Sequence, residues 1–193
     1  MTTRAAQRPL ATSAKSPALL TWEQFQRRYL MREDSFKYEW VNGRVEKMPR
    51  SMDKTQLYIL INLMRFLAHL KASGLQIIGE LVSEGDTFFA GNHRRPDIAY
   101  YNDAQIQAAR HNEDVHPDFV IEVISKHDQL EKVARKMEDY RAAGVAVVWH
   151  IFSQFKQVHV YRGKRMQICT GDDLCSAEPV IPGFVLPVGE IFK

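Results

Sequence analysis

Apolar residues recur along this chain at two spacings, one typical of helices and one typical of strands. Over residues 53–72 they return every three or four positions, which predicts a long amphipathic helix. Its predicted apolar stripe comprises Leu57, Leu60, Met64, Leu67 and Leu70, widened by Ile61 and Leu63. A second long helix is predicted over residues 129–143, and Gly144 would end it. Shorter helices are expected over residues 22–31, where Thr21 and Gln24 have capping-box spacing, and over residues 103–110.

Strand patterns fill most of the remaining chain. FKYEWV and RVEKM flank Asn42-Gly43, which predicts a β-hairpin. Five further strands are expected over residues 75–82, 86–90, 96–101, 118–124 and 146–152, followed by a hairpin of residues 157–161 and 165–170. Because long helices separate the strands, we expect an α/β fold with a mixed sheet and helices on both of its faces.

The charge balance separates a short tail from the rest of the chain. Lysine and arginine total 26 and the acids 23, and the excess of +3 lies in residues 1–17, which hold Arg4, Arg8 and Lys15 and no acid. We predict a disordered basic tail over 1–17 and a single domain over 18–193. Hydrophobic content of 45% and charged content of 25% suit a globular protein. A neutral body excludes a protein held to nucleic acid by bulk charge alone, but not one with a local basic groove.

The N-terminus lacks the apolar core of a secretory signal, and no apolar run is long enough to span a membrane. We therefore expect a cytoplasmic protein without a membrane partner. Organellar targeting by the acid-free tail is a minor alternative.

Two carboxylates inside apolar strands carry the chemical information. Asp97 opens PDIAYY and Glu122 stands in the middle of FVIEVI, where a buried carboxylate needs a charged partner, a hydrogen-bond donor or a metal ion. Two such residues on neighbouring strands would form a site for Mg²⁺ or Mn²⁺. Asp118 is a weaker partner for Glu122, because four residues along one strand separate them by about 13 Å. The alternatives are a strand cap for Asp97 and a buried ion pair for Glu122.

These segments resemble a known family. RRPDIAYY, PDFVIEVIS, KMEDY and GVAVVW, together with TWEQF, YEWVNGRVEKM and PGFVLPVGEIF, are similar in order and spacing to the Uma-type family of bacterial restriction endonuclease-like proteins. That family belongs to the PD-(D/E)xK nuclease superfamily. The resemblance covers residues 20–192 and implies an α-β-β-β-α-β restriction-endonuclease-like core, to which this chain adds the N-terminal hairpin and C-terminal β segments. It also implies divalent-metal chemistry and DNA as substrate.

The resemblance also implies roles for individual residues. Asp97, Glu122 and the backbone carbonyl of Val123 match the metal ligands, with Mg²⁺ or Mn²⁺ as cofactor. The superfamily's usual lysine would stand at Ile124, but in this family it lies on the following helix, where Lys136 matches it. Helical geometry agrees with this position, because Lys136 lies about 40° from Tyr140, at the edge of the apolar stripe.

Glu39 matches the hairpin acid of the family, which would complete the metal site or hold a water molecule. Two alternatives stay open. Lys136 could be a solvated lysine paired with Glu138 or Asp139, and Glu39 could lie on an exposed hairpin face, with Glu80 as a weaker competitor for its role.

This sequence departs from the family pattern at two places. Lys54-Thr55-Gln56 stands where a histidine is common, and HIFSQF stands where the corresponding strand usually ends in Asp-Pro. We therefore keep a second hypothesis, a catalytically inactive nuclease fold that acts as a DNA-binding or assembly module. An RNA substrate is also left open.

Basic residues suggest where a nucleic acid could bind. Arg94 and Arg95 precede Asp97 and would reach substrate phosphates, and a basic turn at Arg162, Lys164 and Arg165 could contact a phosphate backbone. For each of them, simple solvent exposure is the alternative. A homodimer is expected if both strands of a duplex are to be cut.

Overall fold

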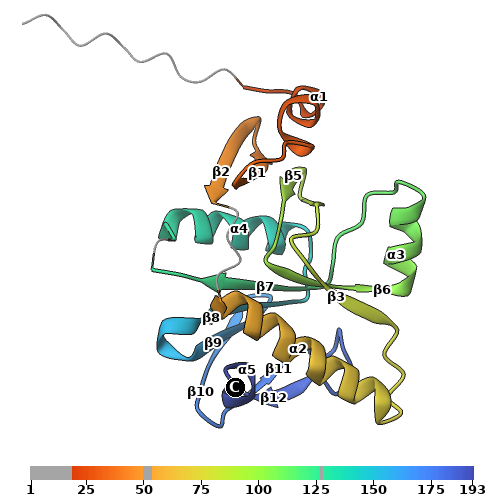
Figure 1. The fold of residues 1–193 in the computed structure, drawn as a ribbon, viewed down its shortest axis with the longest axis vertical. Coiled ribbons are helices and arrows are strands. Elements are labelled where there is room, and N and C mark those ends of the chain that lie inside the picture. The colour runs from red at the N-terminus through yellow and green to blue at the C-terminus, as the bar shows by residue number, and fades with distance from the viewer. Residues whose placement is uncertain (1–18, 50–53, 127) are drawn as a thin grey trace, which may run out of the picture.

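The computed structural model describes residues 19–49, 54–126 and 128–193 (Figure 1). The predicted basic tail of residues 1–17 and Asp53, the predicted first residue of the long helix, lie outside the described residues.

A mixed sheet forms the centre of the fold. Among the described residues its strand order is β10-β9-β8-β7-β6-β3. In chain order, its strands are β3 (Gly79–Ser83), β6 (Ile98–Asn102), β7 (Phe119–Ile124), β8 (Val147–Phe152), β9 (Gln157–Arg162) and β10 (Arg165–Thr170). Among the described strands of this sheet, only β7 and β8 pair in parallel. Helix α4 (Leu130–Ala142) connects them, since parallel neighbours need a long crossover connection.

The two long helices cover opposite faces of this sheet. Helix α2 (Lys54–Ala72) buries Ile59 and Leu63 in a core shared with Trp149, while α4 buries Met137 and Tyr140 in a second core. The elements α2, β3, β6, β7, α4 and β8 therefore follow one another as the predicted α-β-β-β-α-β core, and that prediction is confirmed.

The buried side of α2 coincides with the predicted apolar stripe only in part. Leu57 and Met64 are each 47% exposed, whereas Ile59, Leu63 and Leu67 are buried. The predicted stripe is therefore confirmed for Leu63, Leu67 and Leu70 and wrong for Leu57 and Met64, because apolar residues occur nearly all around this helix. Spacing alone therefore did not determine which side faces the sheet.

The N-terminal hairpin belongs to a second sheet. The order in the described part is β2-β1-β5-β4, with β1 (Phe36–Val41), β2 (Arg44–Pro49), β4 (Thr87–Phe89) and β5 (Asn92–Arg94). Asn42 and Gly43 both have positive φ, as the predicted tight hairpin turn requires. A single register pair, Trp40 with His93, joins β1 to β5. The hairpin is thereby attached to the segment that leads into Asp97 and β6.

Short elements complete the chain. The predicted helix over 22–31 is divided into α1 (Trp22–Phe25), which has the expected capping box, and a π-helical turn, η1 (Gln26–Leu30). The others are α3 (Asp103–Arg110), the 3₁₀ turn η2 (Ser153–Phe155), the strand pair β11 (Leu174–Ser176) and β12 (Val185–Pro187), and α5 (Val188–Ile191). None of the helices in the described ranges has the length and apolar character needed to cross a membrane.

Candidate active site

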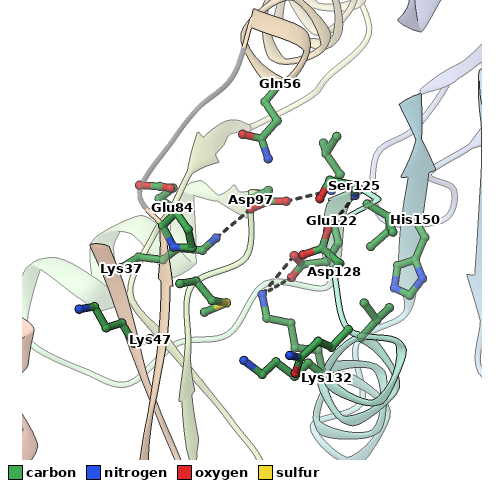
Figure 2. A pocket seen from close by; sticks show the side chains of 17 residues that line it. Lys37, Lys47, Gln56, Glu84, Asp97, Glu122, Ser125, Asp128, Lys132 and His150 are labelled. Atoms are coloured by element: carbon green, nitrogen blue, oxygen red, sulfur yellow. Dashed lines mark hydrogen bonds and ion pairs between the residues drawn. The ribbon is translucent and has the colours of Figure 1, made fainter. Parts of the chain in front are cut away.

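A pocket of about 410 Å³ lies where the N-terminal hairpin, α4 and the strands of the central sheet meet. Its walls include Lys37 on β1, Asp97 before β6, Glu122 and Val123 on β7, and Lys136 on α4. Figure 2 shows Asp97 and Glu122 facing the same space, with Lys37 on one side of Asp97 and His150 on the neighbouring strand. The fold thus gathers chemically active side chains from four separate parts of the sequence.

Asp97 is fixed from two sides. Its Oδ1 accepts a hydrogen bond from Lys37 Nζ at 2.9 Å, and its Oδ2 accepts one from the Val123 backbone N–H at 2.9 Å. The side chain keeps 15% of its surface exposed. The contact with Val123 holds the Asp97 carboxylate against the strand that carries Glu122.

Glu122 is buried on β7 and points toward α4. Lys136 Nζ donates to both of its carboxylate oxygens at 3.1 Å, and the Tyr140 hydroxyl donates to Oε1. Burial raises the pKa of Glu122, and the nearby Asp97 adds to this effect, while Lys136 opposes it. The carboxylate therefore depends on its lysine to stay charged.

Lys136 lies on the buried side of α4, where it contacts two carboxylates. Besides Glu122, its Nζ lies 3.2 Å from Glu39 Oε1. Burial alone would lower the pKa of Lys136, but the attraction of Glu122 and Glu39 raises it. Lys136 is therefore a permanently charged ammonium in the pocket wall. It is not the solvated lysine of the alternative reading.

Glu39 has no exposed surface and lies behind the pocket. Its Oε2 accepts from Arg94 Nη1 at 2.9 Å, and its Oε1 accepts from the Arg95 backbone N–H at 3.0 Å. Burial opposes its charge, yet Lys136 and Arg94 lower the pKa of Glu39 to about 2. The face of the hairpin that carries it is covered rather than exposed. The Glu39 carboxylate contacts Arg94, Lys136 and the Arg95 backbone N–H, and it does not line the pocket.

Both arginines before Asp97 form ion pairs within the fold. Arg94 is 0% exposed and binds Glu39, Glu46 and Asp139. It therefore has no surface for a substrate phosphate, which corrects the expectation that it would contact DNA. Arg95 lies at the edge of the same region, with its Nε 2.6 Å from Asp86 Oδ1.

The predicted basic turn lies away from the pocket. Arg162 donates to the backbone carbonyls of Ser176 and Glu178, so it fastens the C-terminal segment. Lys164 and Arg165 are exposed at the turn between β9 and β10 and do not line the pocket. Glu80 pairs with Lys71 on the protein surface and is also outside the pocket lining.

Sequence reasoning did not assign two groups of the site. Lys37 was not named as a candidate, although its position two residues before Glu39 on the same strand places both on one face. Tyr140 was interpreted as part of an apolar stripe, and its hydroxyl contacts Glu122. Both contacts depend on how α4 and β1 approach the central sheet, which periodicity does not reveal.

A cation at this site would have a small set of protein ligands. Within residues 19–49, 54–126 and 128–193, no group of three or more histidine, cysteine or acidic side chains has the geometry of a metal site. Asp97 and Glu122 are two hard oxygen donors on one pocket, and Mg²⁺ commonly binds one or two carboxylates and takes its other ligands from water and substrate phosphate. The residues present are therefore compatible with such an ion.

Comparisons with known proteins identify the fold and the family of this chain. No curated protein matches the sequence. The fold is similar to the crystal structure of a putative nuclease of DUF820 from Anabaena variabilis, with a TM-score of 0.73 and 19% sequence identity over 91% of this chain and 98% of that one. The model of the Uma2 family, described as "Putative restriction endonuclease", matches residues 22–189. This match covers the whole core and the pocket, and the chain therefore belongs to the Uma2 family.

Proposed function

We propose that this protein is a divalent-metal-dependent endonuclease that hydrolyses DNA phosphodiester bonds. One observation carries the proposal: the carboxylates of Asp97 and Glu122 face one pocket, and the Lys136 ammonium lies against Glu122. Membership of a family of restriction endonuclease-like proteins supports the same reaction class.

Asp97, Glu122 and the backbone carbonyl of Val123 would hold Mg²⁺ or Mn²⁺. When bound, the ion supplies positive charge that stabilises the developing charge on phosphate and makes a water molecule easier to deprotonate. The Val123 N–H keeps Asp97 oriented toward β7 through its hydrogen bond at 2.9 Å. This contact prepares the two carboxylates to act together.

Lys136 would position the water molecule that attacks phosphorus. The attacking water would form a new bond to phosphorus and give up one proton to solvent, one phosphodiester P–O bond would break, and the leaving oxygen would take up a proton from solvent. The ammonium of Lys136 suits this task because Glu39 and Glu122 fix it, and because it stays charged. Glu39 is a positioning residue in this scheme, since it holds Lys136 from behind.

The test is nicking of supercoiled DNA in the presence of Mg²⁺ or Mn²⁺ by Asp97→Asn and Glu122→Gln. We expect each variant to lose at least about 100-fold in rate, as is typical when a group that stabilises a transition state is removed. Glu80→Gln is the matched control, because its carboxylate is exposed and pairs with Lys71 outside the pocket. Cleavage at the wild-type rate by both site variants would overturn the proposal.

A catalytically inactive DNA-binding module is the second candidate. Two observations favour it: Ile124 occupies the place of the superfamily's usual lysine, and Asp97 and Glu122 are already paired with lysines. Calorimetry with Mn²⁺ separates the two candidates. Binding of the ion, alone or with DNA, supports the nuclease, whereas DNA binding without any Mn²⁺ binding supports the inactive module.

Substrate and assembly can be tested with the same preparation. An RNA of matched sequence in the cleavage assay shows whether DNA is preferred. We include a homodimer in the proposal because cutting both strands of a duplex requires two sites. Light scattering with and without a DNA duplex measures the assembly state directly.

A further inference from the structure

Two of the lysines that line the pocket are buried, and each forms an ion pair with one of the two candidate metal ligands, Asp97 and Glu122. Lys136 comes from α4 and holds Glu122, while Lys37 comes from β1 and holds Asp97. Lys37 is as well buried as Lys136, with 7% of its surface exposed. Its Nζ lies 2.9 Å from Asp97 Oδ1 and 3.4 Å from the Arg95 carbonyl oxygen. The ammonium of Lys37 thus occupies one of the two Asp97 oxygens that face the pocket.

The two lysines differ in what holds them. Lys136 contacts Glu122 and also Glu39, which lies behind the pocket. The ion pair between Lys136 and Glu39 would therefore remain if Glu122 bound a metal ion. For Lys37, Asp97 is the carboxylate partner found within the described ranges. The Val123 N–H holds the other oxygen of Asp97 against β7. Of the two ammonium groups, Lys37 therefore has the weaker attachment once its carboxylate is engaged elsewhere.

We propose that Lys37 is a positioning residue that exchanges partners during the reaction: it holds Asp97 before a divalent cation binds, and it turns to a DNA phosphate once the cation has taken Asp97. This inference rests on the proposed function and goes beyond it. A cation bound by the Asp97 carboxylate repels an ammonium that lies 2.9 Å from the same oxygen. A phosphate diester in the pocket offers the displaced ammonium a new anionic partner.

The exchange predicts opposite effects of one substitution on two ligands. Lys37→Met removes the competing charge and keeps most of the side-chain volume, so Mn²⁺ should bind roughly tenfold more tightly in calorimetry without DNA. Lys132→Met is the matched control, because Lys132 lines the same pocket but lies on the outer part of α4. Its Mn²⁺ affinity should change by less than about twofold, since Lys132 is more exposed than Lys37 and has no ion pair with Asp97 among the described residues.

DNA binding supplies the second measurement. The salt dependence of binding to a short duplex is recorded in Ca²⁺, as a stand-in cation for a carboxylate site, and in EDTA. In Ca²⁺ the slope for Lys37→Met should be smaller than that of the wild type by about one, the value for one lost phosphate contact. In EDTA the salt dependence of DNA binding should have the same slope for Lys37→Met and for the wild type. Lys37→Arg, which keeps the charge, should retain the wild-type slope and bind Mn²⁺ no more tightly than the wild type.

The possible outcomes separate this inference from the proposed function. If wild-type protein binds neither Mn²⁺ nor Ca²⁺, the proposed function and the exchange both fail. If wild-type protein binds Mn²⁺ but Lys37→Met binds it no more tightly than Lys132→Met does, only the exchange fails. A smaller slope for Lys37→Met in both Ca²⁺ and EDTA also overturns it, because Lys37 would then contact DNA without being displaced. Circular dichroism of each variant confirms that it is folded.

Discussion

Glu39 remains ionised without any exposed surface, and the reason lies in its three donors. Arg94 and Lys136 each lie about one hydrogen-bond length from its oxygens, and the Arg95 N–H satisfies a further lone pair. A buried charge with this many partners is stable as a group, but the removal of one member leaves the others unpaired. We therefore expect Glu39 to matter for folding as well as for the position of Lys136.

Glu39→Gln should lower the free energy of unfolding by about 3 kcal/mol, because Arg94 and Lys136 lose a buried counter-charge. Urea denaturation at pH 7 measures this change. Glu80→Gln is the control, since its exposed pair with Lys71 should contribute less than about 1 kcal/mol. Equal effects of the two substitutions would show that the network around Glu39 is not the stabilising unit described above.

His150 gives the folded protein a defined pH dependence. Burial lowers its pKa from 6.5 to about 4, and the neighbouring His159, Lys136 and Arg141 act in the same direction. Between these two pH values the unfolded chain binds a proton at His150 and the folded chain does not. Stability is therefore fully present above pH 6.5, and it falls as the pH decreases toward 4.

His150→Phe should remove this dependence. As the pH falls from 7 to 4, the free energy of unfolding of the wild type should decrease by about 3 kcal/mol more than that of the variant. Urea titrations at several pH values measure the difference. Parallel pH profiles for the two proteins would contradict the assignment to His150. Glu39 does not obscure the comparison, because its own loss of stability, which begins near its unfolded pKa of 4.5, occurs in both proteins and cancels in the difference.

Single residues were predictable where their chemistry conflicted with their surroundings. Asp97 and Glu122 were identifiable as candidates because a carboxylate in an apolar strand needs a partner. Lys136 was implied by the family resemblance, with which its place at the edge of a helical stripe agrees. Arg94 shows the limit of such reasoning. Its neighbours Glu39, Glu46 and Asp139 are more than 40 residues away in sequence, so its burial follows from tertiary packing alone.

At the scale of elements, boundaries were easier to predict than orientations. The predicted range of the short helix, residues 103–110, is confirmed as α3, and the Asn-Gly hairpin formed as expected. These two depend on local signals, namely caps and turn residues. The direction of α2 depends instead on which apolar side fits the sheet, and several sides of that helix are apolar.

The orientation of α2 can be tested with neighbouring residues. Leu63→Ala should lower the free energy of unfolding by about 3 kcal/mol, because Leu63 is fully buried against the sheet. Met64→Ala should change it by less than about 0.5 kcal/mol, since Met64 is 47% exposed. Thermal or urea unfolding of the pair provides the comparison. A larger cost at Met64 would mean that the helix faces the sheet as the periodicity had suggested.

At the scale of the whole molecule, the pocket exists because two sheets are joined. The hairpin sheet contributes Lys37 to the pocket wall and Glu39 behind it. Asp97, which directly precedes β6, Glu122 on β7 and Lys136 on α4 form the other walls. The fold class and the order of the core elements were predictable, since they follow from the succession of helices and strands. The closure of the hairpin over α4 was not, because only a single register pair and side-chain contacts between distant residues produce it.

Removal of residues 1–17 tests whether function belongs to the folded body alone. These residues carry the whole net charge of +3, yet the family match begins at residue 22 and the pocket is lined by residues 37–150. A variant that begins at Ala18 after an initiator methionine should bind Mn²⁺ within about twofold of the full chain, because Asp97 and Glu122 keep their partners.

If the tail contacts DNA, the salt slope of DNA binding should fall by no more than about three, one for each lost positive charge. Loss of Mn²⁺ binding would instead show that the tail supports the site. The division of the chain into a basic tail and a neutral, metal-binding body would then be wrong.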